Sequence, residues 1–154
     1  MTVTESYLYY SSPNDQFANF QGLNSKLSYD DSDLLGAFAL HPSVTLLHEV
    51  DGKAGTGSRS GNYWEGAVAP SYSAGPVTIT APLTVGFGSS KFYAKDGYGY
   101  FSAGLNAAYA LPISKTFGTW TANLGGTVYT LDKDVVGGNA ATDIVGQAGL
   151  GVTF

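Results

Sequence analysis

The sequence predicts an all-β protein, an antiparallel up-and-down transmembrane β-barrel of about eight strands. The first observation is residues 76–88, PVTITAPLTVGFG, where apolar side chains occupy every second position and small residues, mostly Thr and Gly, fill the others. Alternation with period two is typical of a β-strand whose two faces meet different environments. A soluble strand shows Lys, Glu or Arg to water, whereas this polar face carries no charge. We therefore expect the apolar face to contact lipid and the other to face a crowded interior.

The second observation is the scarcity of charge. Charged residues are 12% of the 154 residues, about half the usual share, while aromatic residues are 14% and Gly alone numbers 21. Such a chain has too few charges to cover an ordinary soluble surface. No run of 18 apolar residues occurs, so the sequence predicts no transmembrane helix. The net charge of −5 provides no basic patch, so we expect no nucleic-acid partner.

The third observation is that similar strands recur along the chain. One domain, residues 1–154, is expected on length alone. In most of the strands apolar side chains share one face; in the first, the adjacent bulky Tyr9 and Tyr10 leave the facing open. Pro70 and Pro82 are expected to mark bulges or strand ends. The expected strands are residues 3–11, 17–29, 43–50, 63–72, 76–88, 98–111, 119–130 and 140–154.

The connections between these strands differ in length. Residues 51–62, 89–97 and 131–142 are long and polar, whereas 73–75 and 112–118 are compact turns. A turn at Pro13, Asn14 and Asp15 follows the first strand, and residues 30–42 could extend a strand or cap one end of the barrel. Long loops at one end and tight turns at the other are typical of outer-membrane barrels, whose termini lie on the turn side, the periplasm. The polar loops are therefore expected to face outside.

The alternation also turns three charged residues inward: Lys26, Glu49 and Glu65. An eight-stranded barrel is only wide enough for side chains to fill, and an unpaired buried charge costs several kcal/mol. We expect Lys26 to pair with Glu49 or Glu65 and plug the lumen. The alternative is that these charges line a narrow ion path.

Aromatic residues on the apolar faces are expected to form the membrane-interface belts of such a barrel. Trp64 and Tyr72 lie at opposite ends of one face of their strand. The full expected set is Trp64, Tyr72, Phe101, Tyr109 and Trp120.

The last strand carries a resemblance. GQAGLGVTF, with alternating apolar residues and a C-terminal Phe, resembles the terminal-strand signal that the outer-membrane assembly machinery recognises. The resemblance assigns that role to Leu150, Val152 and Phe154. HPSVTLLHEVDG, GVTF and residues 76–111 are similar to an uncharacterised family of porin-like outer-membrane proteins, whose members are usually longer. By strand count the chain is similar to the small OmpA-like and OmpX-like barrels. These resemblances imply a barrel in the bacterial outer membrane.

Motifs of catalysis and of cofactor binding are missing from the sequence. His41 and His48 have no metal-ligand spacing, and no GxSxG occurs, so we expect no metal, no cofactor and no enzyme activity. Asp30, Asp31 and Asp33 lack the spacing of a calcium loop and are expected to form a solvated turn. The Gly55–Gly57 segment lacks the pattern of a phosphate-binding loop.

The expected function is structural or a surface interaction, with the lipid bilayer and the assembly machinery as partners. No signal peptide precedes TVTESYLYY, so an exported chain would be a mature form. The first alternative is a porin-like channel for small solutes or ions, formed as an oligomer if the lumen of one chain is too narrow. The second is a soluble β-barrel or sandwich that binds an apolar ligand, with the apolar face turned inside.

Overall fold

The computed structural model describes residues 1–11, 19–52, 61–93, 95–114, 116, 118–136 and 142–154. The expected turn at residues 13–15, the start of the second strand and the Gly55–Gly57 segment lie outside these residues. So do residues 53–60 of the loop expected at 51–62 and residues 137–141 of the loop expected at 131–142.

Ten β-segments build one sheet. They are β1 (Thr2–Tyr10), β2 (Phe20–Ser28), β3 (Ser43–Gly52), β4 (Asn62–Val68), β5 (Ser71–Ala74), β6 (Val77–Thr80), β7 (Leu83–Gly88), β8 (Gly97–Ala110), β9 (Thr119–Leu131) and β10 (Thr142–Thr153). The helical elements are single turns: α1 (Ser32–Leu35), η1 (Gly36–Phe38) and α2 (Lys133–Val136). None of the helices in the described ranges is long and apolar enough to cross a membrane.

Two pairs of these segments are halves of interrupted strands, so the sheet has eight strands. β4 and β5 are separated at Pro70, and β6 and β7 at Pro82, because proline cannot donate a ladder hydrogen bond. Hydrogen bonds continue across both breaks: Ala81 N donates to Pro70 O at 2.9 Å, and Gly104 N to Pro82 O at 2.8 Å. Pro70 and Pro82 were expected to mark bulges or strand ends, and each stands where a strand segment ends.

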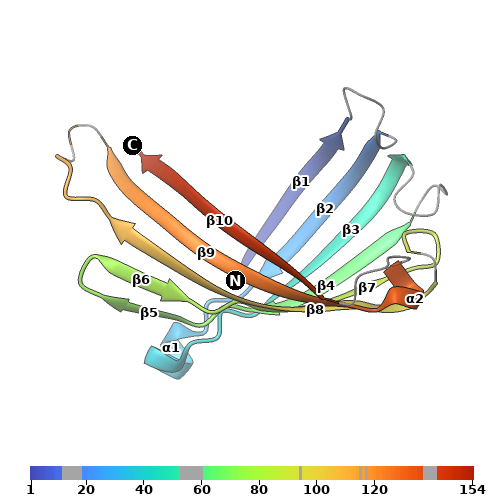
Figure 1. Cartoon of the computed structure of the whole chain (residues 1–154), viewed down its shortest axis with the longest axis horizontal. Coiled ribbons are helices and arrows are strands. Elements are labelled where there is room, and N and C mark those ends of the chain that lie inside the picture. The colour runs from blue at the N-terminus through green and yellow to red at the C-terminus, as the bar shows by residue number, and fades with distance from the viewer. Residues whose placement is uncertain (12–18, 53–60, 94, 115, 117, 137–141) are drawn as a thin grey trace.

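Each strand pairs antiparallel with its neighbour in sequence, in the order β1, β2, β3, β4/β5, β6/β7, β8, β9, β10. The all-β, antiparallel prediction of eight strands is therefore confirmed. The sheet curls through 223° into an open half-barrel, and β1 and β10 are its two edges. Figure 1 shows these edges rising on opposite sides of the cup-shaped sheet.

The two ends of the half-barrel carry different connections (Figure 1). The β5–β6 turn and the connection that contains α1 lie at one end. α2 and the β7–β8 connection lie at the other end, where Lys95 Nζ is 3.5 Å from Asp134 Oδ2. Residues 30–42 therefore do not extend a strand. Their backbone joins the sheet only at its rim, where Tyr29 N donates to Pro42 O and Ala69 N to Leu40 O.

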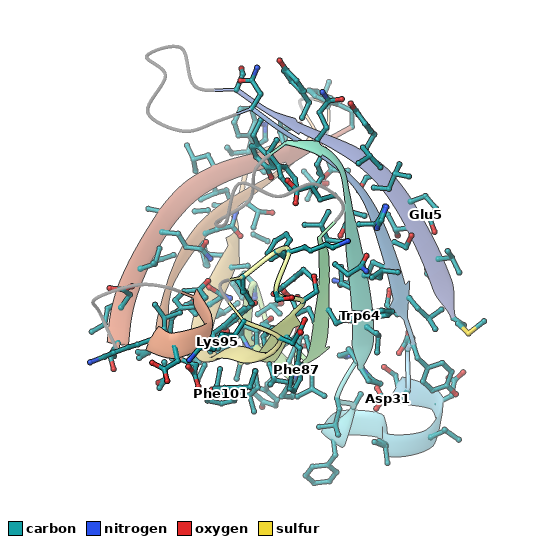
Figure 2. All side chains as sticks on the ribbon, turned by 90° about the vertical axis from the view of Figure 1, so that its right-hand side faces the viewer. Glu5, Asp31, Trp64, Phe87, Lys95 and Phe101 are labelled. Carbon is teal, nitrogen blue, oxygen red and sulfur yellow. The ribbon has the colours of Figure 1, made fainter. Side chains whose placement is uncertain are left out.

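Strand register divides the side chains between two faces. Leu46, Trp64 and Phe87 lie opposite one another on β3, β4 and β7. The adjacent residues Thr45, Glu65 and Gly86 form a second such row. Directly opposed residues in antiparallel strands point to the same side. Figure 2 shows Phe87 and Phe101 pointing away from the hollow of the curled sheet. The face that carries them is called the outer face below, and the face that carries Glu65 the inner face.

Candidate functional site: two faces of the curled sheet

The outer face is apolar and exposed along every strand. Leu124 on β9 is 67% exposed and Leu150 on β10 is 70% exposed. In the described part of the chain, Ala39 is the one buried apolar side chain, and it lies in the β2–β3 connection. The sheet therefore has no apolar core of its own. The exposed apolar side chains of the outer face include Val3, Tyr7, Tyr9, Leu23, Leu27, Val44, Trp64, Tyr72, Ile79, Leu83, Phe87, Tyr98, Phe101, Leu105, Tyr109, Leu124, Val128, Ile144, Leu150 and Val152.

The five aromatic residues expected at membrane interfaces all belong to this outer face. Trp64 and Phe101 lie toward the α2 end, on β4 and β8. Tyr72, Tyr109 and Trp120 lie toward the opposite end, on β5, β8 and the start of β9. The structure thus brings them into two separated groups rather than into one cluster.

The last strand follows the alternation expected of it. Leu150 and Val152 pair with Ala122 and Trp120 on the outer face, and Phe154, just beyond β10, is 97% exposed. Every residue of β10 is exposed. The proposed signal residues are therefore accessible along the edge of the sheet.

Polar pairs also lie on the outer face. Ser25 Oγ donates to Glu5 Oε2 at 2.6 Å, and Glu5 points outward from the edge strand β1 (Figure 2). His48 Nδ1 lies 2.7 Å from Asn62 Oδ1 at the α2 end of β3 and β4. His48 is thus held by a neighbouring side chain, as a structural residue would be.

The inner face carries all three charged residues that the alternation turns inward. Lys26, Thr45 and Glu65 form one row across β2, β3 and β4, and Glu49 lies opposite Gly22. Glu49 is fully buried. Lys26 is exposed, and no ion pair joins it to Glu65 among the residues that the structure describes. A charge pair that plugs the lumen stays a prediction.

Glu65 instead lies in a cluster of aromatic residues. Tyr63 Oη and Tyr100 Oη both donate to Glu65 Oε2, at 2.8 and 2.9 Å, and the two phenol oxygens are 2.6 Å apart. The Tyr63 and Tyr100 rings stack with centroids 6.4 Å apart, and Phe92 packs on Tyr63 at 5.3 Å. Two phenol donors satisfy one carboxylate oxygen without a counter-charge. Sequence reasoning missed this cluster, although Tyr63 and Glu65 stand two residues apart and so share a face.

Glycines on the inner face make room for such contacts. Gly86 lies on β7 between Glu65 and Tyr100, and an added Cβ there would overlap the Tyr100 ring. Gly125 on β9 is covered in the same way by Asn106, and Gly88 by Tyr93. Tyr100 and Asn106 thus each reach across a glycine to the strand beyond it, to Glu65 and to Gln147.

The β2–β3 connection contains a compact acidic group. Asp31 is 6% exposed, and its carboxylate accepts hydrogen bonds from the backbone N–H groups of Leu40 and His41. These bonds outweigh the cost of burial and lower the pKa of Asp31 below its ordinary 3.8. The expectation of a solvated turn was wrong for Asp31, because its carboxylate closes the connection. Asp30, Asp31 and His41 could together offer ligand atoms to a cation, but both oxygens of Asp31 are already engaged by the backbone.

Comparisons with protein-family models, with curated proteins and with solved structures gave no match for this chain. What it does must therefore be argued from the geometry of its two faces.

Proposed function

We propose that this chain is a β-barrel protein of the bacterial outer membrane, with a structural or surface-interaction role. One observation carries the proposal: the sheet exposes nearly all its large apolar side chains on its outer face, while Ala39 is the one buried apolar side chain in the described residues. A monomeric soluble protein rarely exposes an apolar patch above a few hundred Å². A lipid bilayer stabilises this face, because contact with lipid removes the whole apolar surface from water.

The spacing of the aromatic residues supports the same placement. Phe101 and Tyr109 lie eight residues apart on β8, which is about 26 Å along a strand. With the tilt of about 40° usual in such barrels, the two aromatic groups would stand about 20 Å apart across the membrane, close to the apolar band of about 25 Å. In this orientation residues 51–62, 89–97 and 131–142 face outside and both termini face the periplasm.

A porin-like channel is the second candidate. The inner face is polar. The sheet spans an arc of 223°, so the strands of one chain leave this face open on one side. Its lining includes Lys26, Asn106, Asn123 and Gln147. A closed ring with more than eight strands would surround these residues with water.

Folding into vesicles tests the membrane proposal. Chain diluted from denaturant into phosphatidylcholine vesicles is expected to gain β-structure by circular dichroism and to float with the lipid. Without lipid or detergent it is expected to precipitate. Folding into a soluble monomer in plain buffer would contradict the proposal and favour a soluble sandwich.

Two adjacent residues of β9 provide a matched pair of variants. Leu124 points outward near the middle of the strand, Asn123 points inward, and both are exposed. Leu124→Lys is expected to lower the stability of the vesicle-inserted state by about 2–4 kcal/mol, the cost of Lys at the bilayer midplane. Asn123→Lys is expected to insert like the parent chain. Equal behaviour of the two variants would contradict contact between the outer face and lipid.

A further inference from the structure

The proposed membrane barrel is incomplete at the two edges of the sheet. Thr2–Tyr10 and Thr142–Thr153 each pair on one side only, and β10 is exposed along its whole length. Unpaired backbone N–H and C=O groups cost several kcal/mol each in hydrocarbon, so a sheet in lipid must be closed. The inference therefore rests on the proposed membrane location.

The curvature of the sheet bears on how closure occurs. We call the angle around the barrel axis from one strand to the next a step. Eight strands have seven steps, so an arc of 223° corresponds to about 32° per step and leaves 137° of the full 360° open. Eight strands closing on themselves need about 45° per step, and sixteen strands need about 22°. Self-closure would tighten every step by about 13°, whereas joining two copies would relax every step by about 9°.

Contacts on the inner face oppose tightening. The Tyr63 and Tyr100 phenol oxygens are already 2.6 Å apart across the intervening strand. Gln147 Nε2 is already 2.8 Å from Asn106 Oδ1 across Gly125. Tighter curvature would drive these side chains into one another, while flatter curvature only lengthens the contacts.

The two edges also complement each other in side-chain size. β1 is bulky, with Tyr7, Leu8, Tyr9 and Tyr10 in succession. β10 contains three glycines, of which Gly149 and Gly151 face inward; a Cβ added at Gly149 would meet nothing within 4 Å, and one added at Gly151 would meet nothing nearer than 3.9 Å. Inside the sheet, large side chains cover the inner-face glycines of neighbouring strands. The open inner-face glycines of β10, Gly149 and Gly151, thus have the shape that a bulky neighbouring strand would fill.

We propose that a second copy of this chain completes the sheet, with β1 of each copy pairing antiparallel to β10 of the other. β1 and β10 run in opposite directions within one chain, because eight strands alternate. A twofold axis along the barrel therefore brings each β1 beside the partner's β10 in antiparallel orientation at two identical seams. The product is a closed ring of sixteen strands, wide enough for an aqueous lumen.

Disulfide trapping tests this pairing, because the chain has no cysteine of its own. Ser6 points inward from β1, and four inward positions on β10 scan the unknown register: Val145, Gln147, Gly149 and Gly151. Chain carrying only Ser6→Cys is mixed with chain carrying one β10 cysteine, folded into vesicles and oxidised. In at least one mixture we expect a disulfide-linked species of twice the chain mass, since a disulfide needs Cα atoms within about 7 Å.

The control places the second cysteine at Thr127, on the same face but one strand in from the edge. Thr127→Cys mixed with Ser6→Cys is expected to give no linked species. Native mass spectrometry in detergent is expected to show two chains per particle.

Two results would overturn the inference. In the first, a chain that carries both cysteines forms the disulfide within itself, at unchanged mass. This would show that the eight strands close on themselves. Chains that float with vesicles yet form no mixed disulfide at any β10 position would show that strands other than a second copy complete the sheet. A chain that fails to float contradicts the membrane proposal as well, so the two failures are distinguishable.

Discussion

Gln147 and Asn106 meet across a whole strand: Gln147 Nε2 on β10 donates to Asn106 Oδ1 on β8 at 2.8 Å, above Gly125 of β9. Only a residue without a side chain leaves room for this bond, because an added Cβ at Gly125 would overlap Asn106 Oδ1. The glycine therefore permits a contact between strands that do not pair.

Gly125→Ala is expected to remove this bond and to lower the free energy of unfolding in vesicles by about 1 kcal/mol, the usual net value of one hydrogen bond. The matched control is Gly126→Ala, one residue further on the outer face, where an added Cβ would meet nothing nearer than 3.9 Å. That control is expected to be neutral or slightly stabilising. Urea titration of vesicle-inserted protein measures both, and equal losses would contradict the crowding argument.

The cluster around Glu65 gives a second prediction. Glu65→Leu leaves the Tyr63 and Tyr100 hydroxyls without their shared carboxylate acceptor, and hydrogen bonds to a charged group are worth about 1.5–3 kcal/mol. A stability loss of about that size is expected. Glu65→Gln keeps an acceptor oxygen and is expected to lose about half as much.

A double-mutant cycle separates this cluster from simple loss of packing. Removing both hydroxyls with Tyr63→Phe and Tyr100→Phe is expected to make Glu65→Leu much less costly, because no donor is then left unsatisfied. If Glu65→Leu costs the same with and without the hydroxyls, the hydrogen bonds do not account for its effect.

Alternation along each strand predicted the faces of the sheet well. Val85, Phe101 and Leu124 were all expected on the apolar face, and all three lie on the outer face. The pattern could not decide the first strand, because Tyr9 and Tyr10 are both bulky. In the structure Tyr9 points outward and Tyr10 inward, where its ring lies 5.9 Å from that of Phe20.

Contacts over longer distances could not be predicted from alternation. The alternation predicted that Lys26 and Glu65 share a face. It carried no information on which side chains reach Glu65 from strands that do not pair with its own, as Tyr100 does. The extent of the curl, 223°, could not be predicted for a related reason. It depends on how far inner side chains such as Tyr100 can lean over glycines such as Gly86, which is a property of three strands together. Asp31 was misjudged because nothing in DDSD shows that the chain returns at Leu40.

The hydrogen bonds of Asp31 predict a dependence on pH at the rim of the sheet. The pKa of Asp31 is lower in the folded protein than its ordinary 3.8, because its carboxylate accepts the N–H groups of Leu40 and His41. The folded state therefore gains stability from ionised Asp31 above pH 3.8, and loses it as the pH falls through the lower folded value. Protection of the Leu40 and His41 amides from hydrogen exchange, corrected for the intrinsic rate, is expected to decrease over that range.

Asp31→Asn is expected to remove most of this pH dependence and to lower the amide protection already at neutral pH, because a neutral amide accepts hydrogen bonds less strongly than a carboxylate. The matched control is Asp33→Asn, since Asp33 is exposed in the same connection. It is expected to leave both amides as protected as in the parent chain. Protection at Leu40 and His41 that does not change with pH in the parent chain would show that Asp31 does not hold this connection closed through its charge.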